Sequence, residues 1–190
     1  MTKQPVRVAV LVSGGGTNLQ ALLDTLSSSS IARIARVISN RSHAGALERA
    51  RRASVPTVIL RDPGDAAELL AALGDAQLVV LAGYLKLVPR AVVSRFRGRM
   101  INIHPALLPD FGGPGMYGHH VHAAVLASGA KESGVTVHLV DEEFDRGEII
   151  AQEKVPVRPG DTAEVLAARV LEAEHRLLPK VVLDLARRLT

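Results

Sequence analysis

The chain has 190 residues, a formal net charge of +4 and no cysteine. The absence of cysteine excludes a disulfide scaffold, a cysteine nucleophile, an iron–sulfur cluster and a zinc site with thiolate ligands. The 23 basic residues are spread along the chain, and only 3% of the residues are aromatic, so the composition favours a small anionic substrate over nucleic acid.

No segment predicts a membrane span or a signal peptide. The most apolar stretch, 78–93, is interrupted by Gly83, Lys86, Pro89 and Arg90, whereas a span needs about 20 apolar residues in a row. The apolar run near the N-terminus is too short and too charged for a signal sequence. We therefore expect a cytoplasmic protein without a membrane partner.

The first half of the chain alternates between strand-like and helix-like segments. The run 6–12 is almost continuously apolar, as in a strand buried within a parallel sheet. After it, leucines recur at helical spacing over 19–26. Further segments alternate in the order 34–39, 44–53, 57–60, 65–73, 78–82, 89–96 and 100–103. Repeated strand–helix–strand units predict a parallel sheet with right-handed crossovers.

The second half follows a different pattern. A loop rich in glycine and proline, 109–118, leads into a predicted helix over 121–128. Two strand-like segments, 134–140 and 148–155, flank an acidic turn, DEEFDRG. A turn of that length favours a hairpin, so this pair is predicted to extend the sheet with antiparallel strands.

The segment from residue 160 to the C-terminus predicts a long helix. Asp161 or Thr162 is a candidate N-cap, and Pro179 is predicted to kink or divide the helix. Together these elements predict an α/β fold: one three-layer α/β/α domain over 1–190, with a mostly parallel, Rossmann-like sheet extended by an antiparallel C-terminal strand pair.

The first candidate binding motif is SGGGTN, 13–18, between the first strand and the first helix. Glycines permit close backbone approach, and the start of a helix offers free N–H groups, a combination that binds phosphate. The third glycine of a dinucleotide fingerprint is replaced by Leu19, and the Gly-Lys pair of a P-loop is absent. From the residues alone, a plain glycine turn remains an alternative.

The second motif is INIHPALLP, at the carboxyl end of the predicted strand 100–103. Asn102 and His104 are two residues apart, so they share one face of an extended segment. An amide donor and an imidazole at this position can stabilise an oxyanion or transfer a proton, although they also fit a purely structural role.

The third motif is the acidic turn, which places Asp145 at its end. A carboxylate near a histidine raises the pKa of the imidazole and orients the ring. Taken alone, the acidic residues of this turn equally fit a solvated loop.

Several segments together resemble one known family. They are VLVSGGGTNLQALLD, VVLAGYLKLVP, INIHPALLPDFGG, SGVTVHLVDEEFDRGEIIAQEKVPV and EAEHRLLP, in that order. The chain resembles the phosphoribosylglycinamide formyltransferases over nearly its whole length. The resemblance implies transfer of a formyl group from 10-formyltetrahydrofolate to the amine of glycinamide ribonucleotide in purine synthesis, without a metal, by a monomer or homodimer.

The resemblance also implies roles for individual residues. Asn102, His104 and Asp145 match the catalytic residues, with Asp145 expected to hold His104 cationic. The halves 1–103 and 104–190 are then expected to bind the nucleotide and to carry folate binding and catalysis, respectively. The residues implied to bind the nucleotide are Gly15, Gly16, Thr17, Asn18 and Glu174. Those implied to bind folate are Leu85, Lys86, Leu87, Val88, Asn102, Val140 and Asp141.

Two departures from the family pattern leave assignments open. The loop after LLP is longer than usual, so the substrate-loop histidine could be His119, His120 or His122. A zinc site formed by His104, His120 and His122 is a minor alternative. The segment expected to carry a folate-contacting arginine is shortened, and Arg61 is the nearest candidate.

Other functions use a similar core. Methionyl-tRNA formyltransferase and formyltetrahydrofolate hydrolase carry an extra domain, for which we expect 190 residues to leave no room; a sugar-nucleotide formyltransferase is harder to separate. A nucleotide-dependent oxidoreductase is disfavoured by the incomplete glycine fingerprint. A non-catalytic nucleotide-binding module would not need Asn102, His104 and Asp145 together.

Overall fold

The computed structural model describes residues 4–190. The strands are β1 (Val6–Val12), β2 (Ala32–Ser39), β3 (Thr57–Ile59), β4 (Leu78–Leu81), β5 (Met100–His104), β6 (Glu132–Leu139) and β7 (Ile149–Pro156). The helices are α1 (Thr17–Leu26), α2 (Gly45–Arg52), α3 (Ala66–Leu73), α4 (Arg90–Arg95), α5 (His119–Ala127) and α6 (Ala163–Leu189). Most boundaries lie within two residues of those predicted from the sequence.

The strands form one seven-stranded sheet in the order β3-β2-β1-β4-β5-β6-β7. The first five strands are parallel, while β6 pairs antiparallel with both β5 and β7. This confirms the predicted α/β fold with its antiparallel extension. Successive strands are added on one side of β1 and then on the other, so the strand order reverses between β1 and β4. Ligands of open α/β sheets bind at the carboxyl ends of strands at such a point.

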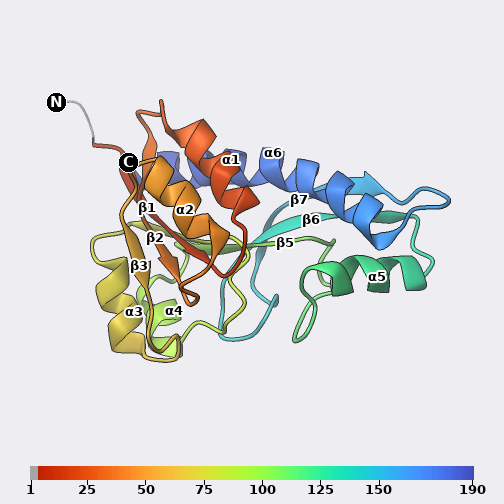
Figure 1. The fold of residues 1–190 in the computed structure, drawn as a ribbon, viewed down its shortest axis with the longest axis horizontal. Coiled ribbons are helices and arrows are strands. Elements are labelled where there is room, and N and C mark those ends of the chain that lie inside the picture. The colour runs from red at the N-terminus through yellow and green to blue at the C-terminus, as the bar shows by residue number, and fades with distance from the viewer. Residues whose placement is uncertain (1–3) are drawn as a thin grey trace.

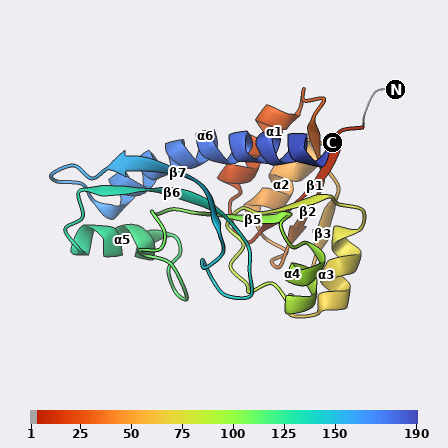
Figure 2. The ribbon, with the colours of Figure 1, turned by 180° about the vertical axis from the view of Figure 1, so that it is seen from behind.

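Helices cover both faces of the sheet. Residues Val6, Val8, Val10 and Val12 of β1 pack into a cluster with α1, α2 and α6, whereas Ala9 and Leu11 pack into a second cluster with α3 and α4. In Figure 1, α1 and α6 lie above the sheet and α3 and α4 below it, and Figure 2 shows the same layers from behind. The continuous apolar run of β1 thus follows from burial on both faces.

The terminal helix confirms its predicted N-cap, and only the predicted division at Pro179 is wrong; the alternative, a kink at Pro179, stays a prediction. Thr162 is the N-cap, because its side chain accepts a hydrogen bond from the Val165 N–H, but Pro179 does not divide the helix: α6 is continuous from Ala163 to Leu189. Proline removes one backbone hydrogen bond from a helix interior. Here Pro179 is buried, and α6 packs along α1, β6 and β7, so apolar burial offsets that loss.

Within residues 4–190, no helix combines the length and the hydrophobicity needed to cross a membrane.

Candidate active site

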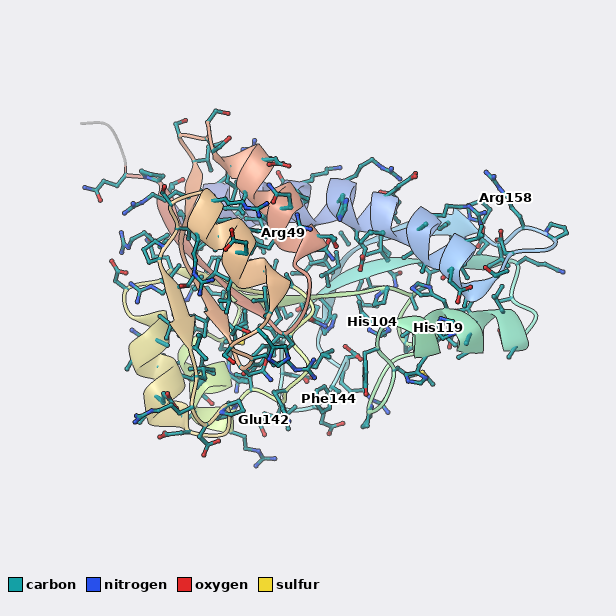
Figure 3. The ribbon with its side chains drawn as sticks, viewed as in Figure 1. Arg49, His104, His119, Glu142, Phe144 and Arg158 are labelled. Atoms are coloured by element: carbon teal, nitrogen blue, oxygen red, sulfur yellow. The ribbon has the colours of Figure 1, made fainter. Side chains whose placement is uncertain are left out.

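A pocket of about 620 Å³ lies at the carboxyl ends of β1, β4 and β5. Figure 3 shows three of its lining residues, His104, His119 and Phe144, which come from β5, α5 and the β6–β7 loop. Most residues that the sequence indicated line this pocket: Thr17, Asn18, Leu85, Lys86, Leu87, Val88, Asn102, His104, Val140, Asp141, Asp145 and Glu174. Gly15 and Gly16 precede Thr17 but do not line it.

Asn102 and Asp145 meet inside the pocket although 43 residues separate them. The Asn102 Nδ2 atom donates to Asp145 Oδ1 over 3.2 Å and to His138 Nε2 over 3.1 Å. His138 Nδ1 donates to the carbonyl oxygen of Leu139 over 2.8 Å, which leaves its Nε2 atom facing Asn102 and Asp145. Both amide hydrogens of Asn102 are thereby directed at named partners.

His138 is a candidate site residue that the sequence reasoning missed. The residue is 2% exposed, and its Nε2 atom lies 3.5 Å from Asp145 Oδ1. The signal was the strand pairing: Asn102 of β5 lies directly opposite His138 of β6. Residues opposite each other on antiparallel strands project to the same face of the sheet, so correct alignment of the two strands would have placed both side chains together.

His104 is buried and contacts two groups. Its Nε2 atom donates to the carbonyl oxygen of Phe111 over 2.8 Å, and its Nδ1 atom lies 3.5 Å from Asp145 Oδ2. Burial lowers the pKa of His104, and the opposing attraction of Asp145 does not restore it. The expectation that Asp145 keeps His104 cationic is therefore wrong for this structure, because loss of hydration outweighs the ion pair.

Asp145 lies in the loop between β6 and β7 and adopts a left-handed backbone conformation with φ 55°. Its Oδ2 atom accepts from the Gly113 N–H over 3.0 Å. Burial acts to raise the pKa of Asp145, but His138, His104 and the Gly113 amide together lower it below its ordinary value. The carboxylate is therefore ionised at neutral pH and ties the β6–β7 loop to the loop 109–118.

The glycine loop enters α1 through Gly16, which is the N-cap and has φ 76°. A Cβ at this position would lie 2.5 Å from the Cβ of Ala46 in α2, so both the backbone conformation and the packing require glycine. The first turn of α1 exposes backbone N–H groups at the edge of the pocket, as an anion site does.

Glu174 of α6 lies beside this loop. It is 7% exposed and accepts a hydrogen bond from Asn18 Nδ2 over 3.2 Å. Burial raises the pKa of Glu174 to about 7, and the Asn18 hydrogen bond opposes that shift only in part. Two of the residues implied to bind the nucleotide thus contact each other across 156 positions of sequence.

Ser13 joins the glycine loop to the segment after β4. Its N–H donates to the Gly83 carbonyl oxygen over 3.0 Å, and its Oγ accepts from the Leu85 N–H over 2.9 Å. The same hydroxyl donates to Asn40 Oδ1 over 2.6 Å. Because Ser13 is only 1% exposed, this three-way junction is shielded from water.

An apolar mouth surrounds the other end of the pocket. Leu85, Leu87 and Phe144 are each more than a third exposed, yet all three line the pocket. Exposed apolar side chains gathered at a cavity indicate binding of a ligand with an apolar or aromatic part. Lys86 lies among them and supplies a positive charge at this mouth.

The residues whose roles the sequence did not decide differ in their position relative to the pocket. His119 and His122 line the pocket, whereas His120 does not. Arg61 is largely exposed, contacts Glu68, and does not line the pocket. Within residues 4–190, no group of three or more histidine, aspartate or glutamate side chains converges as metal ligands do, so His104, His120 and His122 form no such site.

Comparison with known proteins identifies relatives over almost the entire chain. Residues 6–182 match the formyl transferase family. Phosphoribosylglycinamide formyltransferase of Haemophilus influenzae is 40% identical over 185 residues, covering 93% of this chain and 85% of that protein. The chloroplastic phosphoribosylglycinamide formyltransferase of Arabidopsis thaliana is 45% identical over 186 residues. That match covers 93% of this chain but 64% of the plant protein, so this chain spans less than two thirds of the plant protein's length.

The same relationship holds in three dimensions. The crystal structure of phosphoribosylglycinamide formyltransferase from Anaplasma phagocytophilum superposes with a TM-score of 0.89 and 40% sequence identity. The superposition covers 96% of this chain and 87% of that one.

Proposed function

The chain belongs to the formyl transferase family, and from that premise we propose that it transfers the formyl group of 10-formyltetrahydrofolate to the amine of glycinamide ribonucleotide. The products are formylglycinamide ribonucleotide and tetrahydrofolate. The observation that carries the proposal is one pocket that combines a glycine loop at a helix start, an apolar mouth, and the cluster of Asn102, His104, His138 and Asp145.

The two substrates enter from different sides of the pocket. The phosphate of the nucleotide binds the free N–H groups of the glycine loop and of Thr17 and Asn18. Glu174, beside Asn18, accepts from the ribose hydroxyls. The pterin and benzoyl rings of the folate occupy the apolar mouth formed by 85–88 and the loop after β6. This arrangement brings the substrate amine and the formyl carbon together at Asn102 and His104.

The reaction begins with attack of the substrate amine on the formyl carbon. A C–N bond forms, and the carbonyl electron pair moves to oxygen, giving a tetrahedral intermediate with a negatively charged oxygen. The Asn102 amide donates a hydrogen bond to this oxygen. To do so, one of its two N–H groups gives up its present hydrogen bond to His138 or Asp145. A preorganised donor contributes roughly 3–4 kcal/mol to lowering the barrier, and the exchange of partners by Asn102 reduces its contribution below that value.

Proton transfer completes the reaction. The attacking nitrogen loses a proton, the bond from carbon to the folate nitrogen breaks, and that nitrogen gains a proton. The lowered pKa of His104 favours the neutral ring, whose Nδ1 atom can accept a proton as the intermediate forms, since the new cation then faces Asp145. Asp145 stabilises that imidazolium and orients the ring, so it acts with His104 as a pair.

The formyl transfer assay tests this proposal. Purified protein is incubated with 10-formyltetrahydrofolate and glycinamide ribonucleotide, and both tetrahydrofolate and formylated nucleotide are measured. We expect the two products in equal amounts, and neither without the nucleotide. Release of formate without nucleotide would instead identify a hydrolase, and formylation of an amino-sugar nucleotide would identify a sugar-nucleotide enzyme. Either result alone would contradict the proposed acceptor.

The wider expectations remain predictions. They are a reaction without a metal, a monomer or homodimer that binds neither nucleic acid nor membrane, and a cytoplasmic location. Sedimentation of the purified protein distinguishes a monomer from a homodimer. Activity that persists after exhaustive treatment with a chelator would support a reaction without a metal.

A further inference from the structure

Helix α2 holds the glycine loop from the side. The Ala46 N–H donates to the carbonyl oxygen of Gly14 over 3.1 Å, and Arg49 Nε donates to the carbonyl oxygen of Gly15 over 2.8 Å. Gly45 packs against Gly15, since a Cβ on Gly45 would lie 3.4 Å from the Gly15 Cα atom. Two successive carbonyl groups of the loop are therefore directed at α2.

This orientation decides where the N–H groups of the loop point. In a trans peptide, the C=O of one residue and the N–H of the next point in opposite directions. Because the Gly15 carbonyl points toward Arg49, the Gly16 N–H points away from α2. The Gly14 carbonyl directs the Gly15 N–H in the same way. Arg49 thus fixes the loop in the conformation that presents its N–H groups to an anion.

Arg49 is also placed as a free positive charge. Its Nη1 atom donates to Gln20 Oε1 over 3.2 Å, on the first turns of α1, and Figure 3 shows Arg49 between α2 and α1. Within residues 4–190, no carboxylate lies within ion-pair distance of its guanidinium. Burial lowers the pKa of His175 in α6, and the charge of Arg49 lowers it further.

We infer that Arg49 is a positioning residue for the phosphate of the nucleotide substrate: it sets the Gly15–Gly16 peptide for anion binding and adds an unneutralised charge beside the start of α1. This inference rests on the proposed function, because that function places the phosphate at the glycine loop. It assigns to α2 a part in substrate binding although Arg49 does not line the pocket.

Kinetics of Arg49→Met and Arg49→Lys test the inference. A lost hydrogen bond to a charged group corresponds to roughly a tenfold to hundredfold effect, so Arg49→Met is expected to raise the KM for glycinamide ribonucleotide by that factor. The KM for formyltetrahydrofolate and kcat should change less than about twofold. Arg49→Lys retains the charge but cannot contact Gly15 and Gln20 as a planar fork, so an intermediate KM is expected.

The matched control is Arg52→Met. Arg52 lies on the same helix, is 78% exposed and contacts Glu48, so its loss removes an equal charge without touching the loop. The inference is overturned if Arg52→Met raises the nucleotide KM as much as Arg49→Met does. It is also overturned if Arg49→Met weakens the dephosphorylated substrate, glycinamide ribonucleoside, by the same factor as the nucleotide.

A binding measurement separates this inference from the proposed function. Inorganic phosphate should raise the Tm of the wild-type protein and of Arg52→Met, but not that of Arg49→Met. This result would support Arg49 even if the protein formylated a different phosphorylated amine. An equal stabilisation of all three proteins, or none of the wild type, would overturn the role of Arg49. Failure of the formyl transfer assay alone would overturn only the proposed acceptor.

Discussion

The two ends of the pocket are built in different ways. The glycine loop is shaped within and just beyond one β-α-β unit: Gly16 caps α1, and the Ala46 N–H and the Arg49 side chain of α2 hold the carbonyl groups of Gly14 and Gly15. The proposed catalytic cluster, Asn102, His104, His138 and Asp145, depends on side chains from β5, β6 and the β6–β7 loop, which come together only through an antiparallel strand pair. A local motif can preset a binding site, whereas the reacting groups require long-range assembly.

The comparison predicts that kcat falls most when the carboxylate shared by the proposed catalytic cluster, that of Asp145, is changed. Asp145→Asn removes the charge that contacts His104, His138 and the Gly113 amide. We expect kcat to fall by roughly 10³-fold with little change in either KM, because general acid–base and electrostatic contributions are of this size. Steady-state kinetics measure the effect. Glu148→Gln, on the same loop, is the control, and a kcat for Asp145→Asn near that of the wild type would remove Asp145 from the mechanism.

Glu174 sharpens the comparison from the other end, because it is the buried side chain beside the glycine loop. Its pKa of about 7 in the folded protein exceeds the ordinary 4.5, so the folded state holds the proton more tightly than the unfolded state. Stability should therefore fall as pH rises from about 4.5 through 7, by about 3 kcal/mol in full.

Glu174→Gln lacks this titration. Urea unfolding at pH 5.5, 7 and 8 should show the variant gaining stability relative to the wild type as the pH rises. A stability difference that does not change with pH would mean that the pKa of Glu174 is not raised by burial.

His138→Ala tests whether the long-range assembly matters as a unit. It leaves Asn102 Nδ2 without one of its two acceptors and removes a neighbour of Asp145. We expect a reduction of kcat by roughly tenfold to a hundredfold, smaller than for Asp145→Asn because Asn102 and Asp145 still contact each other. In the double variant with Asp145→Asn, the increase in activation free energy should be smaller than the sum of the increases in the two single variants. Full additivity would show that His138 acts independently.

Ser13→Ala should give the smallest effect, a loss of stability. It tests the junction that joins the glycine loop to the segment after β4. The substitution leaves the Leu85 N–H and Asn40 Oδ1 without their Ser13 partner in a buried place. We expect a loss of about 1–3 kcal/mol in the free energy of unfolding, measured by urea denaturation. Ser27→Ala, at the exposed C-terminus of α1, serves as the control. If both variants lose the same small amount of unfolding free energy, the Ser13 hydrogen bonds do not stabilise the fold more than an exposed serine does.

The sequence predicted the local features well because their causes are local. Three glycines between an apolar strand and an amphipathic helix indicate the loop, and the alternation in 101–104 places Asn102 and His104 on one face. His138 could not be recognised in this way, because its role depends on the alignment of β5 with β6. The lowered pKa of His104 follows from burial by distant segments, and Pro179 stays inside α6 because packing overrides the local rule.

The junction at Ser13 has a consequence for redesign. Ser13 of the glycine loop hydrogen-bonds both to the segment after β4 and to Asn40 at the end of β2. The glycine loop and the segment after β4, which are proposed to bind the two substrates, are therefore coupled to each other. A change made by rebuilding the glycine loop is therefore expected to alter the apolar mouth at Leu85 as well. Under the proposed function, variants should therefore be tested on both substrates together, because the two segments share the Ser13 junction.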